Sequence, residues 1–162
     1  MCDKTCIEEA KSLWKEYGGE DNVVTFVVVS RLPRNALVEW QILAHRSPLS
    51  LQYRYEAVTS STEKLAEIHT LHSEDLISLL CFIDFPGENK VSSNEECFKK
   101  VWLTMIEILG DCCTLRVYYQ VDCDFSFWSQ MQNIVPKTTS VTFVPVWSFE
   151  GERGAVICGM RY

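Results

Sequence analysis

The chain has 162 residues, of which 47% are hydrophobic and 23% charged, a composition typical of a folded globular protein and not of a disordered or fibrous one. Its net charge is −7 and its 15 Lys and Arg residues are scattered, which argues against nucleic-acid binding, because phosphate recognition requires clustered basic residues. No apolar run reaches the roughly 18 residues of a membrane-spanning helix, and the charged, amphipathic first segment does not fit a secretion signal.

The first 45 residues predict a helix followed by a β-hairpin. Thr5 and Glu8 have the spacing of a capping box, and apolar residues then recur at helical spacing until a pair of glycines. Two apolar runs, at 23–31 and 36–44, flank a turn that contains Pro33 and therefore predict a hairpin. Because a two-stranded hairpin is marginally stable alone in water, we expect this segment to dock on the rest of the chain or on a neighbouring molecule.

The remaining sequence predicts a mixture of strands and helices, and hence an α+β domain. Residues 65–72 (LAEIHTLH) fit neither the strand period nor the helix period well, so both assignments stay open for them. The other segments are assigned from alternation, from helical spacing and from bounding Gly and Pro residues. They are strands at 51–59, 76–85 and 114–122, helices at 93–109 and 125–135, and a second hairpin at 141–162.

The eight cysteines do not have the arrangement of a disulfide framework or a zinc module. None forms a CxxC pair, and several lie inside apolar runs. In a chain of this length without a secretion signal, such cysteines act as small hydrophobic residues. We therefore expect reduced, mostly buried thiols in a cytoplasmic protein.

Two histidines are the residues that come nearest to a metal site. If residues 65–72 were helical, His69 and His72 would share one face of the helix, with Cys81 nearby in sequence, but a zinc site requires three or four ligands in an organised arrangement. Asp122 and Asp124 flank a cysteine after a strand and are interpreted as caps of the following helix. The sequence therefore predicts no metal and no cofactor.

A short repeat links the two ends of the chain. The string VTFV occurs at 24–27 and again at 141–144, each time after a Trp-bearing helix and before a turn and a second strand. This shared order predicts a truncated first repeat at 1–45 and a complete, diverged second repeat at 46–162.

The segment SRLPRNALVEWQILAH (30–45) closely resembles the C-terminal hairpin of the Rid (YjgF) family, once named for an endoribonuclease of the L-PSP type. The resemblance implies a chorismate-mutase-like α+β fold, with helices on one face of a mixed sheet, and trimers whose sheets pack around a shared axis. Tandem Rid-like domains form the C-terminal region of long forms of diphthine–ammonia ligase, which amidates a modified histidine of elongation factor 2. The SGGKDS-like nucleotide loop of that ligase's ATP-pyrophosphatase domain is absent from this sequence.

Active Rid proteins hydrolyse imines and enamines, and the resemblance implies an Arg that holds the substrate carboxylate and a Glu that positions water. The Arg position falls on Val24 in the first repeat and near Thr138 in the second. The Glu position falls on Glu39 in the first repeat, and on Ile157 or Cys158 in the second. Glu39 is thus the single, weak catalytic candidate, and it also fits a polar residue on the outer face of an alternating strand.

We therefore expect a non-catalytic Rid-like accessory or oligomerisation module, a pseudoenzyme associated with diphthamide biosynthesis. Its expected partner is a second copy of itself, as a homo-oligomer, or its own second repeat through intramolecular Rid–Rid packing. Two alternatives remain open. One is a small imine or enamine deaminase that uses Arg54 or Arg116 to hold the carboxylate. The other is a regulatory domain that binds a metabolite without converting it.

Overall fold

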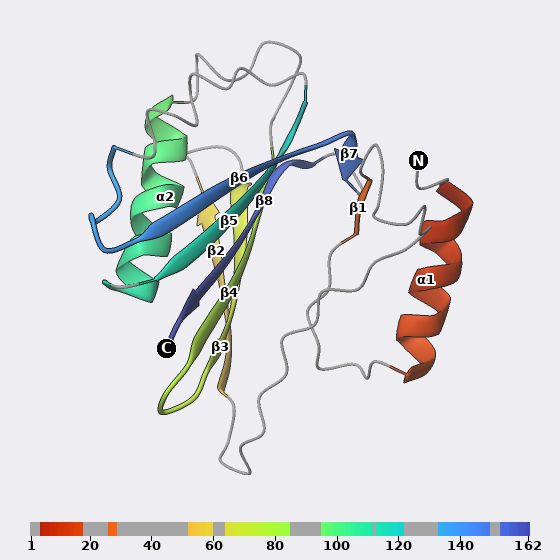
Figure 1. The fold of residues 1–162 in the computed structure, drawn as a ribbon, viewed down its shortest axis with the longest axis horizontal. Coiled ribbons are helices and arrows are strands. Elements are labelled where there is room, and N and C mark those ends of the chain that lie inside the picture. The colour runs from red at the N-terminus through yellow and green to blue at the C-terminus, as the bar shows by residue number, and fades with distance from the viewer. Residues whose placement is uncertain are drawn as a thin grey trace.

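The computed structural model describes residues 4–17, 26–28, 52–59, 64–84, 95–111, 113–121, 133–149 and 153–162. Within these residues the chain forms two helices and eight strands (Figure 1). In chain order they are α1 (Lys4–Tyr17), β1 (Val27–Val28), β2 (Gln52–Thr59), β3 (Lys64–His72), β4 (Ile77–Asp84), α2 (Glu95–Leu109), β5 (Thr114–Gln120), β6 (Ser140–Val146), β7 (Ser148–Phe149) and β8 (Arg153–Arg161).

Six of these strands form one mixed sheet in the order β2-β3-β4-β8-β5-β6. Every neighbouring pair is antiparallel except β5 and β6, which run parallel. The expectation of an α+β chain built on a mixed sheet is therefore confirmed. The hairpin predicted at 141–162 is wrong, because β5 lies between β6 and β8. Strand β8 pairs instead with β4 on one side and β5 on the other, and its Ala155, Val156 and Ile157 are fully buried.

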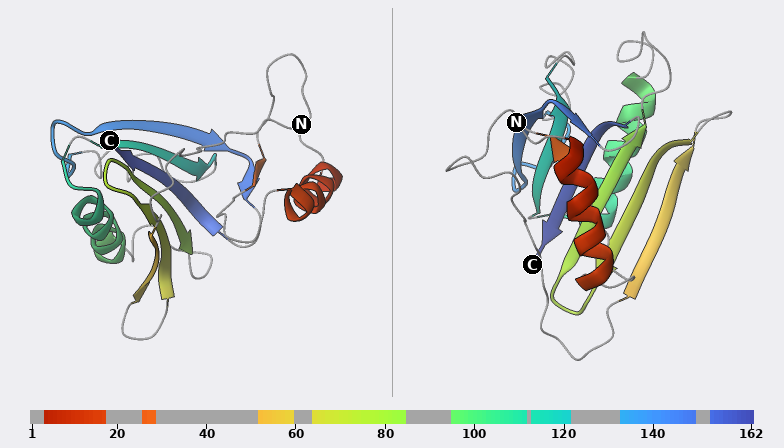
Figure 2. Two further views of the ribbon diagram at one scale, coloured as in Figure 1. Left: turned by 90° about the horizontal axis from the view of Figure 1, so that it is seen from below. Right: turned by 90° about the vertical axis from the view of Figure 1, so that its right-hand side faces the viewer.

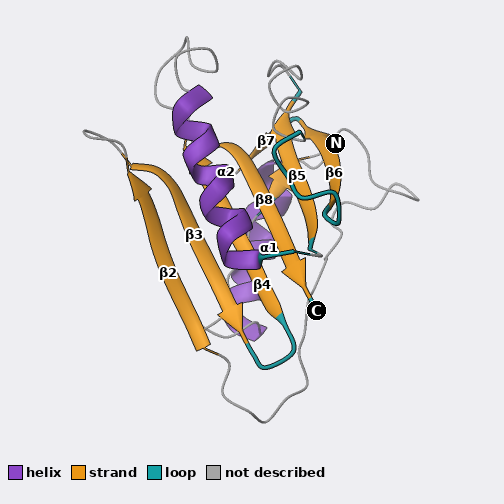
Figure 3. Cartoon of the chain, turned by 90° about the vertical axis from the view of Figure 1, so that its left-hand side faces the viewer, coloured by secondary structure: helices purple, strands orange, loops and turns teal. Residues whose placement is uncertain are grey.

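Helix α2 covers one face of the sheet, as Figure 3 shows from the helix side. Its apolar stripe, with Trp102, Met105 and Leu109 fully or almost fully buried, packs on the main core cluster that the strands contribute. The helix ends at Gly110, whose φ of 69° lies in the left-handed region and whose N–H donates to the Ile106 carbonyl at 2.7 Å. The helix predicted at 93–109 is therefore confirmed, with its glycine stop.

The other predictions have mixed outcomes. The strands predicted at 51–59, 76–85 and 114–122 are confirmed as β2, β4 and β5. The ambiguous segment 65–72 is a strand within β3, with buried residues on the α2 side and partly exposed ones on the other. Most of the predicted helix at 125–135 lies outside the described residues, and 133–135 form a turn and bend. The first hairpin lies outside them too, apart from Phe26 and β1.

A second, smaller core lies on the face of the sheet opposite α2. There Phe82 and Val156 cluster with Val146 and Phe149, and Val27 packs against them. Strand β1 pairs antiparallel with β7, so that Val27 lies opposite Phe149. At these residues the first 45 residues do contact the rest of the chain, as expected. Beyond β1, helix α1 lies on the side of the sheet away from α2 (Figure 2), so the expectation that the helices share one face of the sheet is wrong for the two described helices.

Four of the cysteines have described side chains, and these are free thiols. They are Cys6, Cys81, Cys113 and Cys158, of which Cys81 and Cys113 are buried in the core. The pKa of Cys81 is raised well above its usual range, chiefly because burial disfavours the thiolate. These thiols therefore pack as small apolar groups.

Gly159 offers a test of the contact between α2 and β8. A Cβ at this position would lie 2.5 Å from Cδ1 of Leu109 and 3.0 Å from Cδ2 of Leu115, both fully buried. Gly159→Ala should therefore lower the free energy of unfolding by about 1–3 kcal/mol through overpacking, as measured by denaturant unfolding. Thr142→Ala on the exposed side of β6 is the control and should change it by less than about 0.5 kcal/mol. Equal effects of the two changes would contradict this description of the core.

Val27 tests whether the second core stabilises the fold. Val27→Asp would bring a carboxylate against the apolar cluster around Phe149 and should lower the free energy of unfolding by about 1–3 kcal/mol. Val121→Asp is a matched control, because the Val121 side chain is 56% exposed. If the two variants melt at the same temperature, β1 does not contribute to the stability of the sheet.

Candidate functional site

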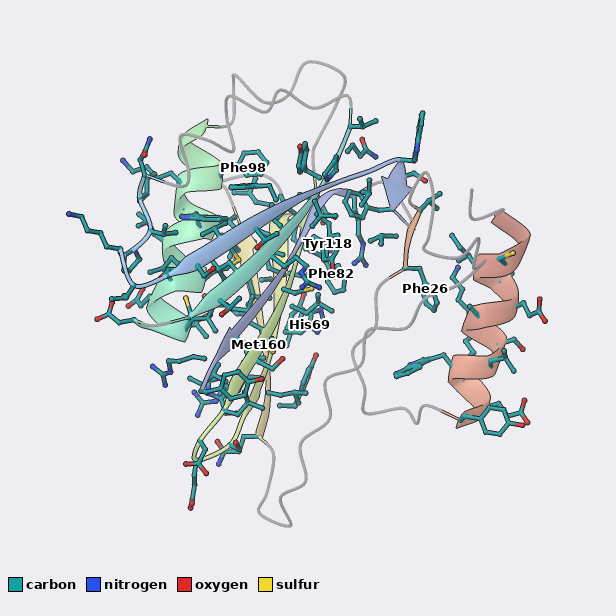
Figure 4. All side chains as sticks on the ribbon, viewed as in Figure 1. Phe26, His69, Phe82, Phe98, Tyr118 and Met160 are labelled. Atoms are coloured by element: carbon teal, nitrogen blue, oxygen red, sulfur yellow. The ribbon has the colours of Figure 1, made fainter. Side chains whose placement is uncertain are left out.

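Polar and aromatic side chains gather on the sheet face opposite α2, across β2, β3 and β4. We call this group the His69 cluster: Tyr53, Tyr55, Glu67, His69 and Phe82. Strand alternation and register bring it together, because Tyr55 lies opposite His69 on β3, and Glu67 lies opposite Phe82 on β4. Figure 4 shows His69 and Phe82 on this side of the sheet and Phe98 on the α2 side.

His69 occupies the centre of the cluster. Its Nδ1 is 2.7 Å from the Tyr53 hydroxyl, and its Nε2 is 3.9 Å from a carboxylate oxygen of Glu67. The rings of Tyr55 and Phe82 lie edge-on to the imidazole, with centroid distances of 5.2 Å and 5.4 Å. Burial lowers the pKa of His69 below its usual range, and the nearby Glu67 only partly offsets this effect. His69 is therefore a neutral imidazole at physiological pH, held by rings on two sides.

The charged neighbours of His69 are already paired with other groups. The Lys64 ammonium donates to Glu67 and lowers the pKa of that carboxyl. The Arg153 guanidinium lies 3.6 Å from the centroid of the Phe82 ring, a cation–π contact. Glu67 is thus engaged by Lys64 and is not positioned as a free base for His69.

The cysteine on this face is not a reactive nucleophile. Cys158 is separated from His69 by Leu80 in the register of β3, β4 and β8. Burial raises the pKa of the Cys158 thiol to about 11, whereas a nucleophilic cysteine has a lowered pKa and a base within hydrogen-bond reach. At neutral pH the group is a protonated thiol, and the cluster does not form a nucleophile–base pair.

The side chains that were considered as metal ligands do not lie close to one another. Residues three apart on a strand point to opposite faces, so the imidazole of His72 lies on the α2 side, with its Nε2 2.9 Å from the Thr70 hydroxyl, while His69 lies on the other side. Cys81 is fully buried in the α2 core. The idea that His69 and His72 share a helix face is therefore wrong. Among the described residues no group of three or more metal-ligating side chains occurs.

Of the positions that the family resemblance singles out for catalysis, the structure describes those of the second repeat. Glu39 and Val24 lie outside the described residues. Thr138 lies in a turn before β6. Ile157 is fully buried in the α2 core, and its neighbour Cys158 points to the opposite face.

The two arginines considered for carboxylate binding are far apart in the sheet. Arg54 is exposed on β2, where its guanidinium donates to the Gln52 side chain at 3.3 Å. Arg116 lies on β5, opposite Cys158 in register, and its hydrogen bond with Tyr118 is the main cause of its raised pKa. Because β2 is the first strand of the sheet and β5 the fifth, either arginine would have to hold a carboxylate without the other.

The sequence did not reveal the His69 cluster, because the cluster depends on register. Alternation along 51–59 placed Tyr53 and Tyr55 on one face of a strand, which is a usable signal. Their contacts with His69 and Phe82 follow only from the pairing of β2 with β3 and of β3 with β4.

The lowered pKa of His69 predicts a pH dependence of stability. A histidine whose pKa is lower in the folded state binds protons more readily when unfolded, so its stabilising contribution is complete above the unfolded pKa of about 6.5 and is lost as pH falls. His72 shifts in the same direction, mainly through burial. The free energy of unfolding should therefore decrease between about pH 7 and pH 5, above the range in which Glu67 titrates. His69→Gln should make this decrease shallower. An NMR titration that gives His69 a pKa at or above 6.5 would contradict the assignment.

Within the described residues, neither helix is long and apolar enough to cross a bilayer. No known protein family model matches the sequence, and no curated protein matches it.

Proposed function

We propose that this chain is a non-catalytic, Rid-like accessory and oligomerisation module of chorismate-mutase-like fold. In this proposal it acts in the cytoplasm in association with diphthamide biosynthesis, like the tandem Rid-like tail of long diphthine–ammonia ligases. The proposed family rests on the resemblance of residues 30–45 to the C-terminal hairpin of Rid proteins. The described part of the chain adds a compatible α+β architecture with one mixed sheet.

The observation that carries the proposal is the composition of the sheet face opposite α2. In an active Rid protein the last strand would supply a water-positioning Glu, but here β8 presents Val156 and Cys158 to that face, in an apolar cluster with Phe82. Leu80, Tyr118 and Val144 extend this cluster as partly buried residues. These side chains are apolar, and Phe82 and Val156 are already buried within the chain itself, which fits a packed core better than a site that binds a charged imine.

The chemistry of the same face argues against the deaminase alternative. A carboxylate substrate requires an unengaged Arg beside a group that activates water. The Cys158 thiol stays protonated because burial raises its pKa to about 11. Arg153 is stacked on Phe82. The described groups therefore favour packing over turnover.

The catalytic half of the proposal is tested with amino-acid-derived imines generated in situ by an amino-acid oxidase. The chain should not accelerate imine hydrolysis above the buffer rate, because the Arg and Glu of the active family are replaced at the matched positions of the second repeat. A bona fide Rid deaminase in the same assay is the positive control. Hydrolysis that rises in proportion to the concentration of this chain would overturn the non-catalytic assignment.

The association with diphthamide biosynthesis needs a separate measurement. The chain should co-elute with the ATP-pyrophosphatase domain of the diphthine–ammonia ligase of its own organism and raise the rate at which that domain amidates elongation factor 2. The Val27→Asp variant, designed to disturb the second core, should do both less well. Independent elution and an unchanged amidation rate would remove the diphthamide context and leave the non-catalytic assignment untouched.

A further inference from the structure

We propose that the outer edge of β2 is a self-association surface, on which two copies of this chain pair antiparallel about a two-fold axis that passes between their Tyr55 residues. The inference rests on the oligomerisation part of the proposed function and gives it a location. It does not depend on the family resemblance.

In the described part of the chain, β2 is an open edge of the sheet. Within the described residues it pairs with β3 alone, and all of its residues except Val58 are exposed. Figure 3 shows it at the rim of the sheet, beside β3. An edge strand presents a row of backbone N–H and C=O groups that can pair with another strand. A second copy of β2 is one such strand, always present at the concentration of the protein itself.

The charges on β2 select one symmetric register. A two-fold axis perpendicular to the sheet keeps each face on its own side, so only residues of the same face can lie opposite one another. With the axis between the two Tyr55 residues, Arg54 lies opposite the partner's Glu56 and Glu56 lies opposite the partner's Arg54. Moving the axis by one residue places Arg54 opposite Arg54, or Glu56 opposite Glu56. Opposite charges facing each other across strands stabilise a pair and like charges destabilise it, so the Tyr55 register is favoured.

The other face of β2 fits the same register. Tyr53 and Tyr55 are each 51% exposed, and pairing about Tyr55 would bring the two copies of Tyr55 side by side. Tyr53 would lie opposite the partner's Ala57, whose small side chain leaves room for the ring. Because His69 already contacts Tyr55 edge-on at 5.2 Å, the two His69 clusters would form one continuous aromatic surface across the interface.

Charges at a sheet edge usually prevent edge-to-edge pairing. A single charge repels its own symmetry mate, and two like charges repel more strongly. Here the two charges are opposite in sign and two residues apart on one face, so a two-fold axis midway between them turns repulsion into two attractive pairs. Two eight-residue edges bury little area compared with a permanent dimer. The expected dimer is therefore reversible and weakens with salt.

Charge reversal and charge exchange test the register. Sedimentation equilibrium of the full chain should show a monomer–dimer equilibrium. Arg54→Glu and Glu56→Arg should each weaken it by about tenfold or more, since both attractive pairs become repulsive. An equimolar mixture of the two variants should recover a heterodimer, and the double variant R54E/E56R should recover the homodimer. Circular dichroism and thermal unfolding would verify that each variant is folded.

Glu107→Arg is the matched control. Glu107 is exposed on α2, and this helix packs on a face of the sheet and not at its edge. The Glu107→Arg variant should therefore leave the dimer unchanged. A dimer that persists in both single variants would show that the copies associate through another face, which overturns this inference and leaves the proposed function intact. A wild-type chain that stays monomeric at every concentration, or variants that weaken the dimer without recovery on mixing, would also overturn it. Only the monomeric result would remove self-association from the proposed function as well.

Discussion

The burial of β8 on both faces is the constraint on which the rest of the structure depends. Ala155, Val156 and Ile157 have no exposed surface, so the strand needs a neighbour on each edge and a cover on each face. Strands β4 and β5 supply the edges. Helix α2 covers one face and the cluster around Phe149 covers part of the other. The absence of a side chain at Gly159 lets Leu109 of α2 approach the strand closely.

Local patterns predicted the elements well and their pairing poorly. Helical spacing and Gly110 were sufficient for α2, because a helix is stabilised by contacts within one stretch of sequence. The same reasoning placed a hairpin at 141–162, since two apolar strands with a turn between them have the local signature of one. That local signature does not indicate that β8 pairs with β4 on one side and with β5 on the other. Period alone also left 65–72 undecided, because the polar residue Thr70 lies buried on the α2 face of β3 while Leu71 lies partly exposed on the other face.

In the candidate site, burial lowers the reactivity of a histidine and a cysteine whose residue types are common in catalytic sites. His69 and Cys158 lie on one face of the sheet and are the residue types of a catalytic dyad. Burial lowers the pKa of the histidine and raises that of the thiol, so both are held in their neutral forms. The sequence drew attention to both residues, but His69 was considered only as a metal ligand and rejected, and Cys158 only as a position where the Glu of the Rid family would fall. Their neighbours Tyr53, Leu80 and Phe82 show instead a packed aromatic surface.

The two edges of the sheet differ in a way that bears on association. At the β6 edge, Pro145 has no N–H to offer a further strand. Immediately after β6, the Trp147 N–H donates to the Val28 carbonyl at 2.7 Å, which ties the chain to β1. At the β2 edge the described chain supplies neither a proline nor a covering strand, and it supplies charges of opposite sign. The β6 edge therefore disfavours a further strand, so the pairing proposed for the β2 edge would stop at two copies and would not extend into an open-ended ribbon.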